Sequence, residues 1–141
     1  MTRGILIYID EDMQLHSTIE FNGNMFPNKI QGHGDKIIAY FALCEKWDTE
    51  EFYDFVEEFD ENNFGYKSAY GSELILSYGL SELKYDIKNN WTDYLYIING
   101  CNDDFIIIGE NGETIIRPNS IAVCNFQKVI EIIPHMIVQR L

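Results

Sequence analysis

The sequence predicts an α+β fold, in which a predominantly antiparallel sheet carries about two helices packed on one face. Short segments rich in β-branched and aromatic residues occur in both halves of the chain, and turn-forming residues separate them. Between these segments, two stretches with helical apolar spacing follow each other directly. The chain has 141 residues, so we expect a single domain over residues 1–141.

The N-terminal part is expected to form a strand, a returning strand and a loop. Residues 4–9 are an apolar run that ends at three consecutive acids, and residues 16–21 alternate well enough to return alongside it. The stretch 22–34 is rich in glycine and asparagine and contains Pro27. Such a composition predicts a loop.

Two helices are expected in the middle of the chain. Apolar residues at helical spacing predict the first over residues 35–46. The second begins at an N-cap, either Asp48 or Thr49, because Glu51 stands three residues after Asp48 as a capping box requires. Its apolar stripe consists of Phe52, Phe55, Val56 and Phe59. The asparagines and glycine of residues 62–65 are expected to end it.

The rest of the chain is expected to be a loop followed by mostly β structure. The loop covers residues 64–72, and residues 74–78 and 83–87 are ambiguous, the first between helix and strand. Strands are expected over residues 94–98, 105–108, 114–117, 121–126, 129–133 and 136–138, the last two broken at Pro134. Asn111-Gly112 predicts a hairpin turn, since both central residues of a type I′ turn need positive φ.

The overall composition excludes several function classes. The formal net charge is −13, which argues against direct binding to nucleic acid or to an anionic membrane. The three cysteines, at 44, 101 and 124, include no CxxC pair and do not suggest a disulfide-framed secreted domain. No apolar run is long enough for a membrane span, and no signal-peptide layout precedes the first strand. We expect a cytoplasmic protein without a cofactor, acting in the host cytoplasm if it is phage-encoded.

The negative charge is concentrated on the second predicted helix and its approach. Residues 45–61 hold nine acids against Lys46 alone. At helical spacing, Glu50, Asp54, Glu57 and Glu61 fall on one stripe opposite the apolar stripe, although like charges at i, i+4 destabilise a helix. The eight acids of residues 48–61 give roughly one negative charge per 2.6 Å of helix axis, while duplex DNA carries about one per 1.7 Å.

This charge density predicts a surface that occupies a basic nucleic-acid channel, with the neighbouring aromatic residues as interface anchors. The alternative is a solvated acidic face, with the aromatic residues covering the end of the core. The predicted partner-binding residues are Asp48, Glu50, Glu51, Asp54, Glu57, Glu58, Glu61, Phe64, Tyr66 and Tyr70.

Catalytic and metal-binding patterns are weak. The three histidines are not in an HExxH motif, and residues 60–65 imitate a calcium loop with Phe64 at a ligand position, so we expect no metal site. The acids of residues 10–12 could bind a hard cation weakly, but turns carry acids routinely, so we interpret them as turn residues. The alternative is a hydrolase-type enzyme that acts through Thr2, which removal of Met1 would make an N-terminal nucleophile, or through a Cys/His pair.

The beginning of the chain carries a family resemblance. Thr2-Arg3-Gly4 before a strand, then Phe21-Asn22-Gly23, Pro27 and Gly32, with His16 between, resembles small uncharacterised proteins of phages and mobile elements. Many of those proteins carry an Asp-Gly-Tyr-Pro segment, which residues 22–27 match loosely with an insertion. The resemblance covers about the first quarter of the chain. It implies a phage or mobile-element origin and no particular activity.

Together these observations favour an acidic inhibitor of a basic nucleic-acid-handling protein, such as a nuclease or a defence effector. It would block the nucleic-acid site by charge mimicry, and its size and acidity are similar to those of phage anti-CRISPR proteins. An immunity protein that neutralises a nuclease toxin is an alternative of the same kind. The enzyme using Thr2 or a Cys/His pair is the alternative of a different class.

Overall fold

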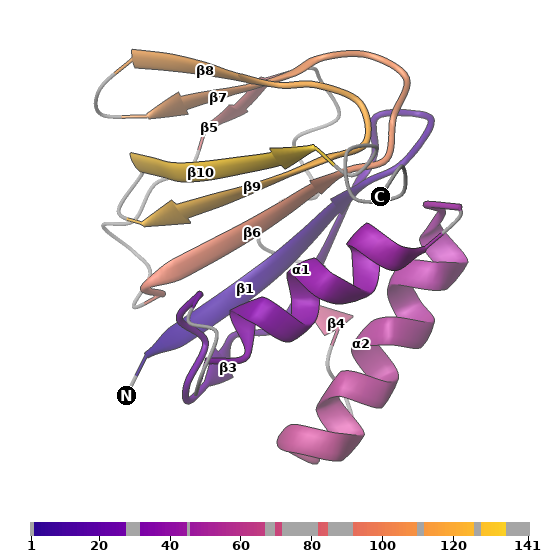
Figure 1. Ribbon diagram of the computed structural model, residues 1–141, viewed down its shortest axis with the longest axis vertical. Helices are drawn as coiled ribbons and strands as arrows, with labels where there is room; N and C mark the ends of the chain where they lie inside the picture. Colours follow the sequence, from indigo (N-terminus) through magenta and orange to yellow (C-terminus); the bar gives the residue numbers. More distant parts are fainter. Residues whose placement is uncertain are drawn as a thin grey trace.

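The structure is a computed structural model that describes residues 2–27, 32–44, 46–66, 70–71, 82–84, 92–109, 112–125 and 128–134. Two helices and ten strands lie in these ranges, and Figure 1 shows their arrangement. In chain order they are β1 (Arg3–Ile9), β2 (Leu15–Thr18), β3 (Phe21–Asn22), α1 (Gly34–Leu43), α2 (Thr49–Asn63), β4 (Tyr70–Gly71), β5 (Glu82–Lys84), β6 (Tyr94–Asn99), β7 (Phe105–Gly109), β8 (Gly112–Ile116), β9 (Ser120–Asn125) and β10 (Lys128–Pro134).

The strands form two sheets, and most neighbours in them are antiparallel. The larger sheet has the order β10-β9-β6-β1-β2-β4, with β3 also paired to β1. At its centre β1 and β6 are parallel, in register from Gly4 opposite Tyr94 to Ile9 opposite Asn99. The smaller sheet has the order β5-β7-β8, with β5 parallel to β7. The predicted α+β class with a mainly antiparallel sheet is confirmed.

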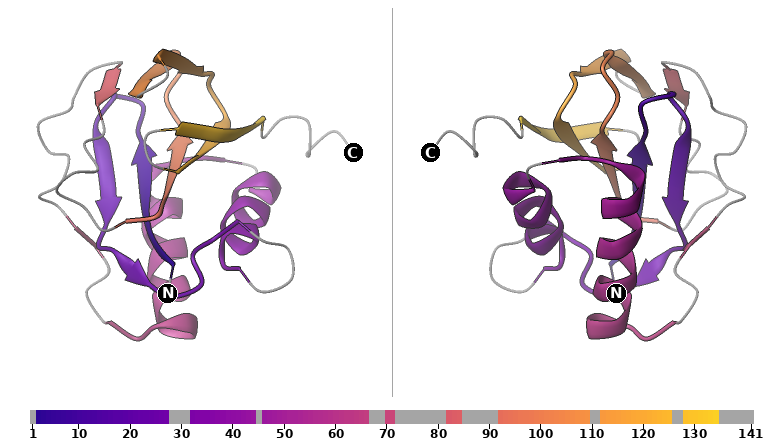
Figure 2. Two further views of the ribbon diagram at one scale, coloured as in Figure 1. Left: turned by 90° about the vertical axis from the view of Figure 1, so that its left-hand side faces the viewer. Right: turned by 90° about the vertical axis from the view of Figure 1, so that its right-hand side faces the viewer.

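The central strands are buried on both faces, and a different layer covers each face. One face, which includes Leu6, Tyr8 and Tyr96, packs against the apolar sides of α1 and α2. The opposite face, which includes Ile7 and Ile97, packs against side chains of β7 and β8. Figure 1 shows β7 and β8 on one side of the larger sheet and the helices on the other, and Figure 2 shows the same layers from the side. The helices therefore lie on one face as predicted, whereas the second sheet was not anticipated.

Helix α2 forms as its sequence predicts. Asp48 is the N-cap, and its carboxylate accepts a hydrogen bond from the Glu51 N–H at 2.8 Å. The apolar stripe is buried against the sheet and α1. At the other end, Gly65 has a φ of +76° and donates its N–H to the Asp60 carbonyl, so the glycine provides the left-handed conformation that ends the helix.

Several predicted boundaries in the first half change. The returning strand is divided into β2 and β3, both antiparallel to β1. Helix α1 ends at Leu43 rather than at residue 46, because Cys44 is already extended, with φ −70° and ψ 132°. The predicted loop over residues 64–72 contains β4, which pairs with β2.

The second half follows the prediction closely where it is described. Strands β6, β7, β8, β9 and β10 correspond to the predicted strands to within two residues at each end. Strands β7 and β8 form the predicted hairpin, but Gly112, whose φ is +113°, pairs with Gly109 and begins β8, so it does not lie at the centre of the turn as predicted. Pro134 ends β10, an edge strand, where its missing N–H costs little. Residues 74–78 and 136–138, as well as Asn111, lie outside the described residues.

The packing of α2 yields a stability prediction for Phe59, which is 4% exposed. Its ring meets that of Phe21 edge-on and stacks on that of Phe55, with centroids 5.2 and 5.5 Å away. Phe59→Ala should lower the free energy of unfolding by about 3–5 kcal/mol, measured by urea titration. Leu43→Ala is the matched control, because Leu43 is 74% exposed at the end of α1 and should change stability by less than about 0.5 kcal/mol. Equal effects of the two substitutions would contradict the packing described here.

Candidate functional site

The outer face of α2 is an acidic surface. Five carboxylates on this helix are exposed, and they lie opposite the buried phenylalanines: Glu50, Asp54, Glu57, Glu58 and Glu61. We call these five residues the acidic face. The spacing of the sequence predicted this orientation of the helix, with the apolar stripe inside and the acids outside.

The remaining two predicted interface acids, Asp48 and Glu51, have partners inside the protein. Asp48 caps α2, and its second carboxylate oxygen lies 3.8 Å from the Lys46 ammonium. Glu51 accepts a hydrogen bond from the Tyr40 hydroxyl of α1 at 2.6 Å. Both side chains are half-buried, so they hold the two helices in place and border the acidic face rather than forming it.

The predicted aromatic anchors lie at the far end of α2. Phe64 is half-buried and covers the end of the core, with its ring centroid 4.9 Å from that of Phe21. Tyr66 is 41% exposed and is the aromatic side chain available to a partner there. Tyr70 lies in β4, and its side chain is outside the described part of the structure.

No base neutralises the acidic face within the described part of the chain. The ion pairs there join Arg3 to Glu20, Lys46 to Asp48 and Arg117 to Asp104, and His16 is hydrogen-bonded to Asp10. Lys36, which is the base on α1, donates instead to the Asn63 side-chain carbonyl at 3.1 Å. Within these ranges the acidic face therefore has no ion-pair partner.

The candidate nucleophiles are poorly placed for catalysis. Burial raises the pKa of the Cys124 thiol to about 12 and also raises the pKa values of Cys101 and Cys44, so none is poised as a thiolate. The Thr2 hydroxyl is buried and makes no hydrogen bond to another described residue. In the same ranges, no three His, Cys, Asp or Glu side chains are grouped to hold a metal ion.

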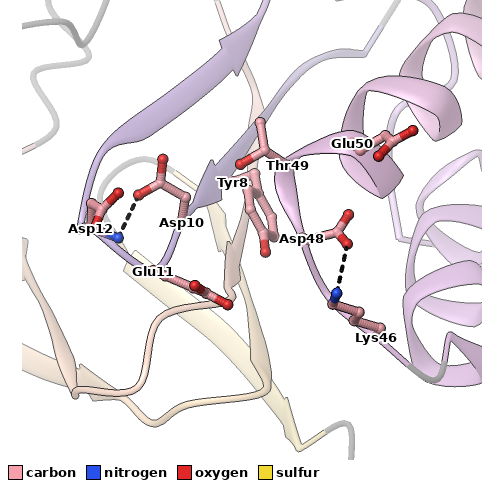
Figure 3. Close-up of a pocket in the computed structure, with 8 residues that line it drawn as sticks. All are labelled: Tyr8, Asp10, Glu11, Asp12, Lys46, Asp48, Thr49 and Glu50. Atoms are coloured by element: carbon pink, nitrogen blue, oxygen red, sulfur yellow. Dashed lines mark hydrogen bonds and ion pairs between the residues drawn. The ribbon is translucent and has the colours of Figure 1, made fainter.

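A pocket of about 370 Å³ lies between the end of β1 and the start of α2, beside the acidic face. Figure 3 shows its lining, in which the acids of the β1–β2 turn lie on one side and Asp48 and Glu50 on the other. The lining residues are Tyr8, Asp10, Glu11, Asp12, Lys46, Asp48, Thr49 and Glu50. Sequence reasoning missed this pocket because it took residues 10–12 as ordinary turn acids.

Asp10 organises the β1–β2 turn at one wall of the pocket. Its Oδ1 accepts hydrogen bonds from the backbone N–H groups of Asp12 and Gln14 at 2.8 and 2.9 Å, and its Oδ2 lies 2.8 Å from His16 Nε2. Partial burial works against ionisation, but the hydrogen bonds from His16 and the two backbone groups outweigh it and lower the pKa of Asp10. The carboxylate form is therefore part of the folded turn.

Comparisons of the chain with protein-family models, curated proteins and solved structures found no match. Within the described residues, neither helix has the length and apolar character needed to cross a membrane.

The Asp10 turn yields a pH prediction. Because the folded state holds Asp10 with a pKa below its ordinary 3.8, the turn's contribution to stability is present above that pH and is lost as the pH falls through the lower folded value. Asp10→Asn should therefore lower the free energy of unfolding by about 1 kcal/mol near neutral pH, where the charged hydrogen bonds exist. The difference from the wild type should shrink toward about pH 3 in urea titrations. A constant difference across this range would show that the carboxylate charge does not stabilise the turn.

Proposed function

We propose that this protein is an inhibitor that binds the nucleic-acid site of a basic protein with the acidic face of α2. The observation that carries the proposal is the set of five exposed carboxylates without a neutralising base in the described part of the chain. A basic surface that normally contacts phosphates is the complementary partner for such a face.

The distribution of charge along α2 supports a binding role over simple solubility. Acids in the first turn of a helix are favourable, but the last turn carries the negative end of the helix dipole, where bases are preferred. Glu61 lies near the C-terminal end of α2, and the last turn contains no base. Solubility alone would be served equally well by interleaved lysines, which would also stabilise the helix.

The spacing of the acidic face also suits phosphate mimicry. From Glu50 to Glu61 the five exposed carboxylates span roughly 17 Å of helix axis. This corresponds to about one charge per 3–4 Å, close to the roughly 3.4 Å per phosphate along one DNA strand. Tyr66, at the end of the helix, adds an exposed ring that can pack at the edge of the contact.

The partner class is a nuclease or a defence effector acting in the cytoplasm. The resemblance of the first quarter of the chain to phage and mobile-element proteins favours a defence effector. An immunity protein for a nuclease toxin would use the same acidic face, so the identity of the captured partner distinguishes these two biological roles.

Charge reversal tests the proposed interface. A variant with Glu50, Asp54, Glu57 and Glu61 changed to Lys should bind the partner at least about 100-fold more weakly, because like charges would then face each other. It should unfold at the same urea concentration as the wild type or at a higher one, since like-charge pairs on the helix are relieved. The measurement is the dissociation constant for a partner captured from host extract and then purified.

Two double variants provide a matched comparison. Glu57→Lys with Glu61→Lys and Asp103→Lys with Glu113→Lys change the net charge equally, but the second pair lies on exposed positions away from α2. Only the Glu57→Lys with Glu61→Lys variant should impair inhibition of the partner. If the quadruple variant folds and still inhibits, or if both double variants impair inhibition alike, the acidic face is not the interface.

Salt and competitor experiments test charge mimicry itself. Exposed charges are screened over about 8–10 Å near physiological ionic strength, so the association rate should fall steeply between about 50 and 500 mM salt while the dissociation rate changes less. Short duplex DNA or RNA should displace the protein from its partner, because both occupy one basic surface. A salt-independent association rate, together with simultaneous binding of protein and nucleic acid, would exclude mimicry.

A further inference from the structure

We propose that the pocket between β1 and α2 binds an organic cation, an alkylammonium or guanidinium group, which is held by the Tyr8 hydroxyl and the surrounding carboxylates. The pocket is distinct from the acidic face, with which it shares only Glu50. It is therefore tested separately from the proposed inhibitor function.

The first observation is the charge of the lining. Five carboxylates surround the pocket, from Asp10, Glu11, Asp12, Asp48 and Glu50, and the one base in the lining is Lys46. A concave site lined mainly by one sign of charge concentrates ions of the opposite sign. The lining therefore selects a cation and repels anionic ligands.

The second observation is the state of Tyr8. Its side chain is fully buried, and its hydroxyl makes no hydrogen bond to any described residue. The ring is stacked on Phe52, with centroids 5.4 Å apart, so its position is fixed by packing. Figure 3 shows the hydroxyl end of the ring directed into the space between the β1–β2 turn and Asp48. Buried hydroxyls normally have a partner, and a ligand N–H at the base of the pocket would provide one.

The electrostatic surroundings keep this hydroxyl neutral. Burial, and after it the carboxylates of Asp48, Asp10 and Glu11, raise the pKa of Tyr8 far above the physiological range. Tyr8 therefore contributes an oxygen that accepts a hydrogen bond, while the acids contribute the charge. An N–H group that carries a positive charge matches both the acceptor oxygen of Tyr8 and the negative charge of the carboxylates.

The geometry favours an organic cation over a metal ion. Asp10 uses its oxygens for the turn and for His16, and Asp48 uses one oxygen to cap α2. No three potential metal ligands are grouped within the described residues, and a volume of about 370 Å³ belongs to the range of small-ligand pockets. Ammonium and guanidinium groups carry several N–H donors that reach acceptors spread around a site.

The ammonium group of Lys46 does not itself act as the cation bound in the pocket. Its side chain is 78% exposed, and its ammonium lies at the pocket rim, 3.8 Å from the Asp48 carboxylate. A bound cation would be repelled by this ammonium. Lys46→Gln should therefore tighten binding, whereas removal of a lysine that acts as a ligand contact would weaken it.

Isothermal titration calorimetry of the purified full chain tests the site with three probes: spermidine, N-acetyl-arginine amide and its uncharged isostere N-acetyl-citrulline amide. The two cations should bind, and the citrulline derivative should bind at least about tenfold more weakly. The cationic group has two sources, a free polyamine or a side chain of a protein. Tighter binding of spermidine assigns the first, and tighter binding of the arginine derivative assigns the second.

Tyr8→Phe removes only the hydroxyl. We expect about a fivefold to tenfold loss of affinity for the cations, with stability unchanged or increased, because that hydroxyl makes no hydrogen bond to a described residue. Tyr96→Phe is the matched control, since Tyr96 is equally buried on the neighbouring strand but its hydroxyl donates to the Met25 carbonyl. It should lower stability and leave cation binding unchanged.

General attraction of cations to an acidic protein is the competing explanation. Glu11→Gln with Asp12→Asn should weaken binding, while Glu57→Lys with Glu61→Lys, on the acidic face outside the pocket, should not. The proposal is overturned if neither cation binds, if the citrulline derivative binds equally well, or if Tyr8→Phe has no effect. If Glu57→Lys with Glu61→Lys abolishes inhibition of the partner but retains cation binding, the pocket and the acidic face act independently.

Discussion

The parallel pairing of β1 with β6 is the constraint on which the rest of the structure depends. Both strands are apolar on their two faces, so each face of the sheet centre must be covered. The helices cover the face that includes Tyr8 and Tyr96, and strands β7 and β8 cover the face that includes Ile7 and Ile97. Because β1 runs between these layers, its C-terminal end emerges beside the start of α2, where the pocket forms.

The same constraint explains how α2 tolerates its charge. Burial of large apolar side chains such as Phe52 and Phe59 contributes about 1.5–3 kcal/mol each, while a like-charge pair at i, i+4 costs only a few tenths. The inner side of the helix therefore decides whether it folds, and the outer side is free to carry acids. The fold therefore does not require the charge on this face.

Local features of this protein were predictable from the sequence, and non-local features were not. The Asp48 cap, the phenylalanine stripe and the closing Gly65 all act within a few residues of α2, so the helix was predicted nearly residue by residue. The central pairing joins Gly4 to Tyr94, ninety residues apart, and no local pattern encodes that choice. The pocket was missed for the same reason, since Tyr8 reads as a core residue until the fold places it near Asp48.

Some of the acids around the pocket have a structural role in the fold, and others do not. Asp10 holds the β1–β2 turn and Asp48 caps α2, so their charges have structural reasons. The side chains of Glu11, Asp12 and Glu50 are exposed and make no hydrogen bond or ion pair to another described residue. Folding places these three like charges in the lining of one pocket, which also includes Tyr8, whose buried hydroxyl has no hydrogen-bond partner among the described residues. Neither these like charges nor the Tyr8 hydroxyl stabilises the folded chain. A bound cation would neutralise the charges and donate a hydrogen bond to the hydroxyl.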